Sequence, residues 1–266
     1  MTEASRDAFL AGRVTAMQPR AGHHRSGLDA VLLAAAFSDK AKGSIVDLGA
    51  GAGVAGFCLA ARAEATRVTL AEREAGLVAL GRAAAALPEN AAFAARLTFA
   101  EADILDAGAR GAAGLVADRF DGVLMNPPFH DEGSVRASPD GARARAHVLD
   151  PGGLDGWFRA AAALLKGGGS LAVILPAARL GDLLASMARR FGGVTVLPIH
   201  PRADEPAIRV LARGVKGSRA PITLLPGLAL HEGEGNAASK AARAMLGDGA
   251  SLADVHMSWR RLGFDP

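Results

Sequence analysis

The chain has 266 residues, of which 50% are hydrophobic, with a net charge of +3 and a single cysteine, Cys58. Its length suits one large α/β domain and is short for two full domains. One cysteine excludes an intrachain disulfide, and the apolar runs are shorter than the roughly 18 residues that a membrane helix needs. The polar N-terminus lacks the layout of a secretory signal. We therefore expect a globular, cytoplasmic protein without a membrane span, in which Cys58 is a packed thiol.

The first 40 residues precede the regular part of the chain. Residues 28–37 are apolar and follow a Ser26-Gly27 turn, which predicts a helix that packs over the start of a sheet. We interpret residues 1–40 as an N-terminal extension that packs on the core.

Strands and helices alternate through the middle of the chain. Short apolar runs predict strands at 44–48, 67–71, 97–100, 120–125, 170–175 and 194–199. Longer runs predict helices at 54–63, 74–87, 154–165 and 181–191. This alternation is typical of an α/β fold with a mostly parallel central sheet and helices on both faces. Residues 208–212 and 222–225 are expected to form an antiparallel edge.

Three segments are predicted loops: 106–114, 130–150 and 231–236. The second is long, polar and rich in arginine, and a loop of that length in a compact domain is usually functional or disordered. Beyond residue 232 the chain is rich in alanine and glycine and predicts only a weak helix. We interpret 41–232 as one domain and 233–266 as a C-terminal tail.

A glycine-rich turn follows the strand at 44–48. Its sequence is Asp47-Leu48-Gly49-Ala50-Gly51-Ala52-Gly53. Glycines there allow a tight turn and a close approach of the backbone to a ligand. Residues 51–56 also match the dinucleotide fingerprint GxGxxG, so a nicotinamide-dependent oxidoreductase is an alternative. The carboxylate of Asp47 would repel a pyrophosphate, however, and suits the sulfonium and ammonium groups of S-adenosylmethionine. The layout resembles the first motif of Rossmann-like methyltransferases.

Two further acids end the next two strands. Glu72 ends the second strand, where an acid in such folds binds ribose hydroxyls. Asp103 follows the third strand, and the resemblance to methyltransferases implies that it meets the adenine amino group of the cofactor. With Asp47, they place three acids at the ends of three consecutive strands, which predicts a cofactor site for S-adenosylmethionine.

The strand at 120–125 ends in Asn126-Pro127-Pro128-Phe129. Two prolines fix the backbone and remove two donors, so carbonyls here are expected to face outward as acceptors. The amide oxygen of Asn126 and the carbonyl of Pro127 could both accept from one planar amino group, and Phe129 offers a ring for stacking. A rigid turn that simply ends the strand is the alternative, but it leaves Asn126 unexplained.

This motif resembles the signature (N/D/S)-P-P-(Y/F) of amino-group methyltransferases. These enzymes act on adenine N6, on guanine N2 of ribosomal RNA, on cytosine N4 or on a protein glutamine amide. The resemblance implies in-line attack of the nitrogen on the sulfonium methyl group, with Asn126, Pro127 and Phe129 holding the acceptor. It also places Asn126 against the cofactor. Two acceptors on the amino hydrogens would stabilise the positive charge that grows on nitrogen.

Two outer segments resemble a narrower family. Residues 18–34 and 200–218 are similar to those of the tRNA1(Val) adenine-37 N6-methyltransferase family. The resemblance implies adenine N6 in the anticodon loop of a tRNA as the acceptor, and it places Arg25 and Asp29 beside the methionine end of the cofactor. Phe129 stands where adenine enzymes more often have tyrosine, and phenylalanine is more usual in the guanine-N2 class. A protein glutamine or a small-molecule O or N acceptor also stays open.

The expected partner is RNA, bound by a monomer or a homodimer. Basic side chains in the loop after Phe129 could hold phosphates or pair with nearby acids; they are Arg136, Arg143, Arg145 and His147. No histidine or cysteine spacing predicts a metal site. A degenerate fold that binds RNA without catalysis is a third alternative, which the intact motifs disfavour.

Overall fold

The computed structural model describes residues 4–20, 26–128, 153–233, 235 and 237–263. A nine-stranded sheet runs through the molecule in the order β10-β8-β9-β7-β6-β3-β4-β5, with β11 also paired to β8. Its strands are β3 (Gly43–Leu48), β4 (Thr66–Glu72), β5 (Leu97–Glu101), β6 (Phe120–Met125), β7 (Leu165–Pro176), β8 (Phe191–His200), β9 (Arg209–Lys216), β10 (Thr223–Leu224) and β11 (Leu228–Ala229).

All neighbours pair in parallel except β9, which is antiparallel to both β7 and β8. The mostly parallel Rossmann-like sheet and the antiparallel direction of residues 209–212 are thus confirmed. The expectation for 222–225 was wrong in direction, because β10 runs parallel to β8. The reason is that β9 ends at the edge where β8 begins, so the next strand leaves from that same edge.

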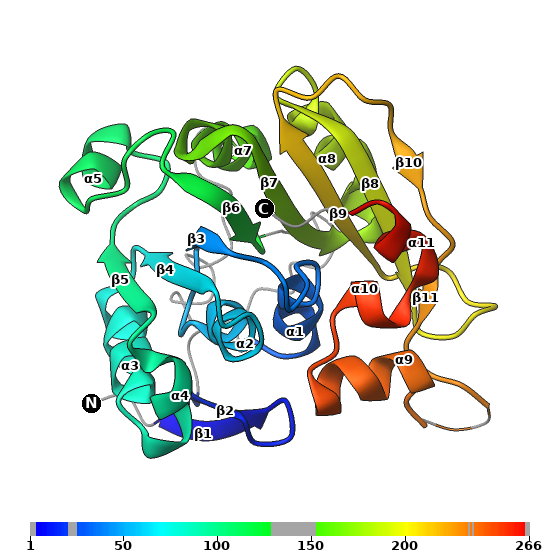
Figure 1. Ribbon diagram of the computed structural model, residues 1–266, viewed down its shortest axis with the longest axis horizontal. Coiled ribbons are helices and arrows are strands. Elements are labelled where there is room, and N and C mark those ends of the chain that lie inside the picture. The colour runs from blue at the N-terminus through cyan, green and yellow to red at the C-terminus, as the bar shows by residue number, and fades with distance from the viewer. Residues whose placement is uncertain (1–3, 21–25, 129–152, 234, 236, 264–266) are drawn as a thin grey trace, which may run out of the picture.

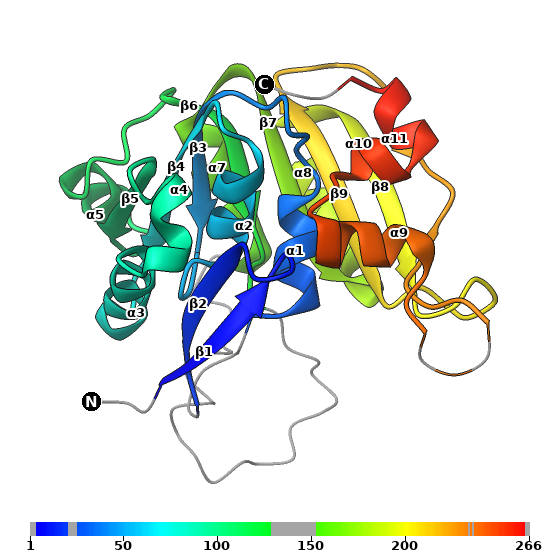
Figure 2. The ribbon, with the colours of Figure 1, turned by 60° about the horizontal axis from the view of Figure 1, so that its bottom comes forward.

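Helices cover both faces of the sheet, as the alternation predicted (Figures 1 and 2). Side chains alternate along β3: Ile45 joins the core cluster that includes α1 and α2, whereas Val46 and Leu48 join the cluster that includes α7 and α8. The helices are α1 (Leu28–Ala34), α2 (Val54–Arg62), α3 (Ala75–Ala85), α4 (Ala91–Ala94), α5 (Ala107–Ala112), α7 (Gly153–Leu164), α8 (Leu180–Met187), α9 (Lys240–Arg243), α10 (Leu252–Val255) and α11 (Met257–Arg261). Short 3-10 turns lie at Pro88–Asn90 and Ala177–Arg179, and a π turn lies at Ala244–Asp248.

An antiparallel hairpin, β1 (Ala4–Phe9) and β2 (Val14–Pro19), precedes α1. The fully buried Asn90 ties it to the domain: its Nδ2 donates to the carbonyls of Thr15 and Ala84, both at 2.7 Å, and its Oδ1 accepts from Thr15 N at 3.0 Å. Figure 2 shows this hairpin beside α2 and α3. The described part of 1–40 thus packs on the core.

Two segments differ from expectation. The loop predicted at 106–114 contains α5, because the Asp106 side chain caps it by accepting from Gly108 N and Ala109 N. Helix α8 ends at Met187 rather than near 191, since Arg189 adopts a left-handed conformation (φ 67°) and Phe191 already starts β8. Both differences come from local backbone chemistry that hydrophobic periodicity does not record.

The described residues of the C-terminal segment are also part of the core. Met245, Leu252 and Trp259 are buried in the cluster that contains α1, and Leu252 N donates to Ala35 O at 2.8 Å. The buried guanidinium of Arg213 lies 5.1 Å from the ring centroid of Phe37 and 5.8 Å from that of Trp259. A separate tail over 233–266 and a domain over 41–232 stay a prediction.

Candidate functional site

The order of successive strands in the sheet reverses between β3 and β6. Strand β3 pairs with β4 on one side and with β6 on the other, and Leu48 lies opposite Met125. Ligands of open α/β sheets bind at such a switch point, at the carboxyl ends of the strands. The glycine turn that follows Leu48 and the motif that begins at Asn126 therefore leave the sheet from adjacent positions at that edge.

The glycine turn requires its glycines. Gly49, Gly51 and Gly53 adopt φ angles of 67°, 58° and 93°, a region that disfavours side chains. A Cβ on Gly49 would lie 2.4 Å from the ring of Trp157 in α7, whereas a Cβ on Gly51 would meet nothing within 4 Å. The turn is thus closed by Trp157 at Gly49 and open at Gly51, which provides room for a ligand against the Gly51 backbone.

Asp47 lies beneath the turn. Its side chain is buried, and its Oδ2 accepts from Gly56 N in α2 at 2.9 Å. Burial raises the pKa of this carboxyl to about 7, the bond from Gly56 N lowers it, and the nearby charge of Glu72 raises it further. Asp47 therefore fixes α2 against the strand end and is a carboxyl whose ionisation a nearby cation would favour.

Glu72 and Asp103 follow on the next two strands. Glu72 Oε2 accepts from Gly51 N at 2.9 Å, and its Oε1 accepts from the amides of Arg73 (2.8 Å) and Glu74 (3.0 Å). Asp103 Oδ1 accepts from Leu105 N at 2.8 Å. The carbonyl of Glu72 accepts from Ala102 N at 3.0 Å, so the two acidic turns are adjacent. The three predicted acids thus share one edge, and Glu72 contacts the open part of the glycine turn.

Asn126 carries an unsatisfied polar atom at this edge. Its Oδ1 is buried and has no hydrogen-bond partner among the described residues. Pro127, which follows it, is buried as well. An unpaired buried acceptor costs about 1–3 kcal/mol, and none of the described residues supplies the donor that this position lacks. Phe129 and the basic residues of the loop after it lie outside the described residues.

Asp29 is held in an ion pair. Its Oδ2 accepts from Arg209 Nε at 2.9 Å, and its side chain is 16% exposed. Arg209 opens β9 opposite Pro176, at the carboxyl end of β7, so the pair lies at the edge that carries the predicted site. Arg25, the other residue that the family resemblance placed near the cofactor, lies outside the described residues.

Sequence reasoning missed Trp157 and Arg209. Trp157 lies in an amphipathic helix, where an apolar residue reads as core, and nothing local relates it to Gly49. Arg209 was seen only as part of a family-like segment. Because β9 is antiparallel to its neighbours, its first residue, Arg209, lies at the carboxyl edge. The predicted antiparallel direction of this strand was the one sequence feature that could have indicated this position.

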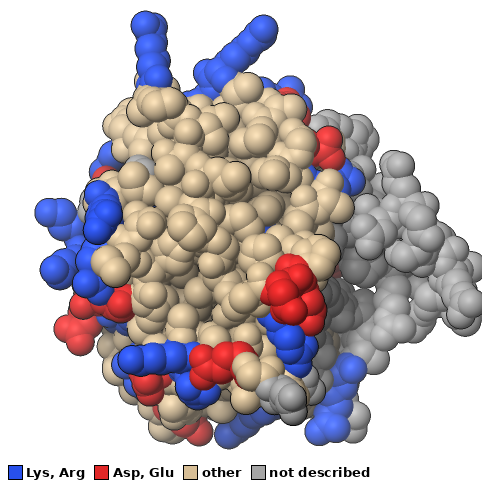
Figure 3. Space-filling view, turned by 90° about the vertical axis from the view of Figure 1, so that its right-hand side faces the viewer, with Lys and Arg blue, Asp and Glu red and all other residues tan. Residues whose placement is uncertain are grey.

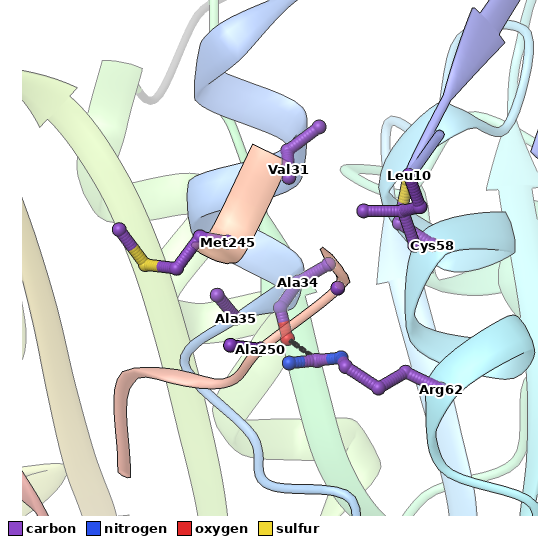
Figure 4. Close-up of a pocket in the computed structure, with 9 residues that line it drawn as sticks. Leu10, Val31, Ala34, Ala35, Cys58, Arg62, Met245 and Ala250 are labelled. Atoms are coloured by element: carbon purple, nitrogen blue, oxygen red, sulfur yellow. Dashed lines mark hydrogen bonds between the residues drawn. The ribbon is translucent and has the colours of Figure 1, made fainter. Parts of the chain in front are cut away.

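Cys58 and Arg62 line a narrow pocket away from this edge, between α1, α2 and the C-terminal segment (Figure 4). Burial raises the pKa of the Cys58 thiol to about 12, so the thiol stays protonated. Arg62 donates to Ala34 O. Among the described residues no group of three or more His, Cys, Asp or Glu side chains is placed to hold a metal, and no helix there is long and apolar enough to cross a membrane.

Several proteins of known structure are similar to this chain in fold, and some are also similar in sequence. A predicted O-methyltransferase from Agrobacterium tumefaciens is 37% identical with a TM-score of 0.71, over 84% of this chain and 97% of that one. The 16S rRNA N2 G1207 methyltransferase of T. thermophilus, solved with AdoMet and guanosine, is 20% identical with a TM-score of 0.51, over 80% of this chain and 50% of that one, and shows the fold alone.

Curated relatives match a shorter part of the chain. The ribosomal RNA small subunit methyltransferase C of Enterobacter sp. (strain 638) is 35% identical over 135 residues, and that of Citrobacter koseri is 33% identical over 127 residues. These matches cover 48% and 46% of this chain but only 35% and 32% of the relatives. Residues 23–200 match the methyltransferase small domain family. The chain therefore belongs to this family of S-adenosylmethionine-dependent methyltransferases.

Proposed function

We propose that the protein methylates an exocyclic amino nitrogen of a purine in RNA. The observation that carries this proposal is the buried Oδ1 of Asn126, which has no hydrogen-bond partner among the described residues and lies one position beyond the strand end beside the glycine turn. An amino group presented there would supply the missing donor. The carbonyl of Pro127, in a backbone stiffened by two prolines, would be the second acceptor.

The cofactor would lie along the ends of β3, β4 and β5. Its backbone contacts would fall at Gly49 and Gly51, where the turn is open at Gly51. Glu72 would hold the ribose and Asp103 the adenine, while Asp47, with Asp29 farther along the edge, would favour the cationic methionine end. When bound, S-adenosylmethionine supplies an electrophilic methyl group on a sulfonium.

The residues of this chain would act by positioning and by charge stabilisation. An aromatic amine is a poor nucleophile because its lone pair is delocalised into the ring. Acceptors on both amino hydrogens oppose that delocalisation and stabilise the charge that develops on nitrogen. No strong base is needed, because the methylated cationic nitrogen is itself acidic.

Two acceptors compete within this proposal. The segments at 18–34 and 200–218 favour adenine N6 in the anticodon loop of a tRNA, where an unstacked base enters a pocket at little cost. The curated relatives and the guanosine-bound structure from T. thermophilus favour guanine N2 in ribosomal RNA. The sequence around Asn126 is compatible with either amine.

The test is methyl transfer from labelled S-adenosylmethionine to purified tRNA, to 16S ribosomal RNA and to a protein fraction. The labelled nucleosides would then be identified by mass spectrometry. We expect N6-methyladenosine in tRNA; N2-methylguanosine in 16S RNA would establish the second acceptor. Label only in protein or small molecules would refute methylation of RNA. Asn126→Ala is the control, because it should abolish the label while the enzyme still binds S-adenosylhomocysteine.

A further inference from the structure

Basic side chains gather at the edge of the sheet opposite the candidate site. We call this the amino edge, where β3, β4, β6, β7 and β8 begin and β9 ends. Six cations that lie there have no side-chain partner among the described residues: Lys40, Lys42, Arg67, Arg119, Arg189 and Arg219. All six are exposed. Figure 3 shows Lys and Arg side chains standing out from the upper rim of the molecule, above a face whose middle carries no charge.

The acids of this edge are largely neutralised already. Lys166 pairs with Asp121 at 2.6 Å, and Lys216 pairs with Asp118 at 2.7 Å. Arg62 and Arg96, also on this side, donate to backbone carbonyls. Asp39 is next to Lys40 in sequence, and Glu64 lies in the turn before β4. The six unpaired cations therefore outnumber these two acids.

At the opposite, carboxyl edge most of the described arginines are held by partners. Four of its described arginines are each paired with an acid: Arg73 with Glu74, Arg179 with Asp182, Arg202 with Glu205 and Arg209 with Asp29. Arg110 donates instead to the carbonyl of Ile104. The predicted cofactor acids Glu72 and Asp103 add further negative charge there. The six exposed cations of the amino edge therefore lie at the opposite end of the strands from the predicted cofactor acids.

The cations form a row rather than a single pocket. Arg67 opens β4 and Arg189 precedes β8, and five strand spacings separate these strands in the sheet, which amounts to about 24 Å. A small anion would be held by a compact cluster. An extended row of unpaired cations fits a polyanion with regularly spaced charges, which is the backbone of a nucleic acid.

We propose that the amino edge binds the phosphate backbone of a structured RNA whose target base is methylated at the carboxyl edge. This inference rests on the proposed function and adds the place where the body of the substrate lies. Strand β3 has six residues, so the two edges are about 20 Å apart. A folded RNA can contact the amino edge with a helical arm while a single-stranded loop reaches the site.

The test compares two triple variants with equal loss of charge. Lys42→Gln, Arg119→Gln and Arg219→Gln neutralise the amino edge. Arg6→Gln, Arg82→Gln and Lys240→Gln neutralise exposed cations on β1, α3 and α9. Fluorescence anisotropy would measure the affinity of each for full-length tRNA and 16S RNA over a range of salt. Methyl transfer would be measured on the better RNA and on a short stem-loop that contains the target base.

We expect the amino-edge variant to bind full-length RNA about tenfold more weakly. The slope of log affinity against log salt should also become less negative by about two to three. The control variant should match the wild type within twofold. Affinity for S-adenosylhomocysteine and methylation of the short stem-loop should be unchanged in both. Equal RNA affinity of the two variants, in an enzyme that methylates RNA, would overturn the inference alone. Salt-dependent loss of binding in the amino-edge variant, in a protein that never methylates RNA, would instead refute the proposed function.

Discussion

Two asparagines with buried side-chain oxygens differ in how the described residues around them satisfy their hydrogen bonds. Asn90 satisfies two backbone groups of Thr15 and one of Ala84, whereas the Oδ1 of Asn126 is unpaired among the described residues. Buried polar groups are nearly always paired. In the proposed function, the amino group of the substrate supplies the partner of the Asn126 Oδ1. Replacing each asparagine by alanine therefore tests folding at Asn90 and function at Asn126.

Asn126→Ala should abolish methyl transfer without unfolding the protein. We expect a fall of about 10²–10³-fold in the single-turnover rate, because one of two acceptors for the amino group is lost. The thermal midpoint should be unchanged or higher, since an unsatisfied acceptor is removed. Asn90→Ala should do the reverse and lower the free energy of unfolding by about 2–4 kcal/mol. Unchanged activity of Asn126→Ala would contradict the role given to its amide.

Asp47 predicts an unusual dependence of stability on pH. Its pKa is about 7 in the folded protein against an ordinary 3.8, so between these values the folded state holds a proton that the unfolded state has released. The free energy of unfolding should therefore fall as pH rises from about 4 to 7 and then level off. Carboxyls whose pKa is lowered, such as Asp121 and Asp254, change the stability only at pH values below about 4.

Asp47→Asn isolates this effect, because the amide oxygen can still accept from Gly56 N. Urea unfolding at pH 5 and pH 8 should show a smaller loss of stability in the variant than in the wild type, by a few kcal/mol at most. Equal pH dependence of the two proteins would show that the Asp47 carboxyl ionises normally.

At the scale of elements, the two glycines of the turn have different surroundings: Gly49 is packed against Trp157, and Gly51 faces open space. Gly49→Ala places a Cβ 2.4 Å from the Trp157 ring, whereas Gly51→Ala adds a Cβ with no neighbour within 4 Å. Both carry the strain of a left-handed alanine, about 1–2 kcal/mol. We expect Gly49→Ala to lower the thermal midpoint more, and Gly51→Ala to weaken S-adenosylhomocysteine binding at least tenfold with a smaller loss of stability.

Calorimetry and thermal unfolding of both variants would measure this difference. Adding Trp157→Phe should recover part of the stability lost in Gly49→Ala and none of that lost in Gly51→Ala. If Gly51→Ala bound the cofactor normally, the open side of the turn would not be the cofactor site.

The elements that the sequence predicted well are the central strands, because their apolar residues and end signals are adjacent in the sequence. Strands such as β3 and β6 are continuous apolar runs, and the turn after β3 and the prolines after β6 mark their ends. The hairpin β1–β2 was missed because its stabilising partner, Asn90, is distant in sequence. The direction of β10 was missed because it depends on where β9 ends. Of the site, the acids and Asn126 follow from strand ends, whereas the Trp157–Gly49 and Arg209–Asp29 contacts require the assembled sheet.

At the scale of the whole molecule, the C-terminal helices complete the core. Trp259 is 3% exposed and lies near Arg213 in the sheet, whereas Met257 in the same helix is 70% exposed. Trp259→Ala should lower the free energy of unfolding by about 3–5 kcal/mol. Met257→Ala should change it by less than about 0.5 kcal/mol. Urea unfolding of both tests whether α11 folds with the sheet; similar values for the two would mean that it does not.

The switch point between β3 and β6 divides the chain as well as the sheet. The residues proposed to hold the methyl donor on the sheet come from β3 to β5, and those proposed to hold the acceptor come from the chain that follows Phe120. Evolution could therefore exchange the second half for a new acceptor while the first half kept its donor. Chimeras joined between α5 and β6 would be a rational route to enzymes of altered specificity.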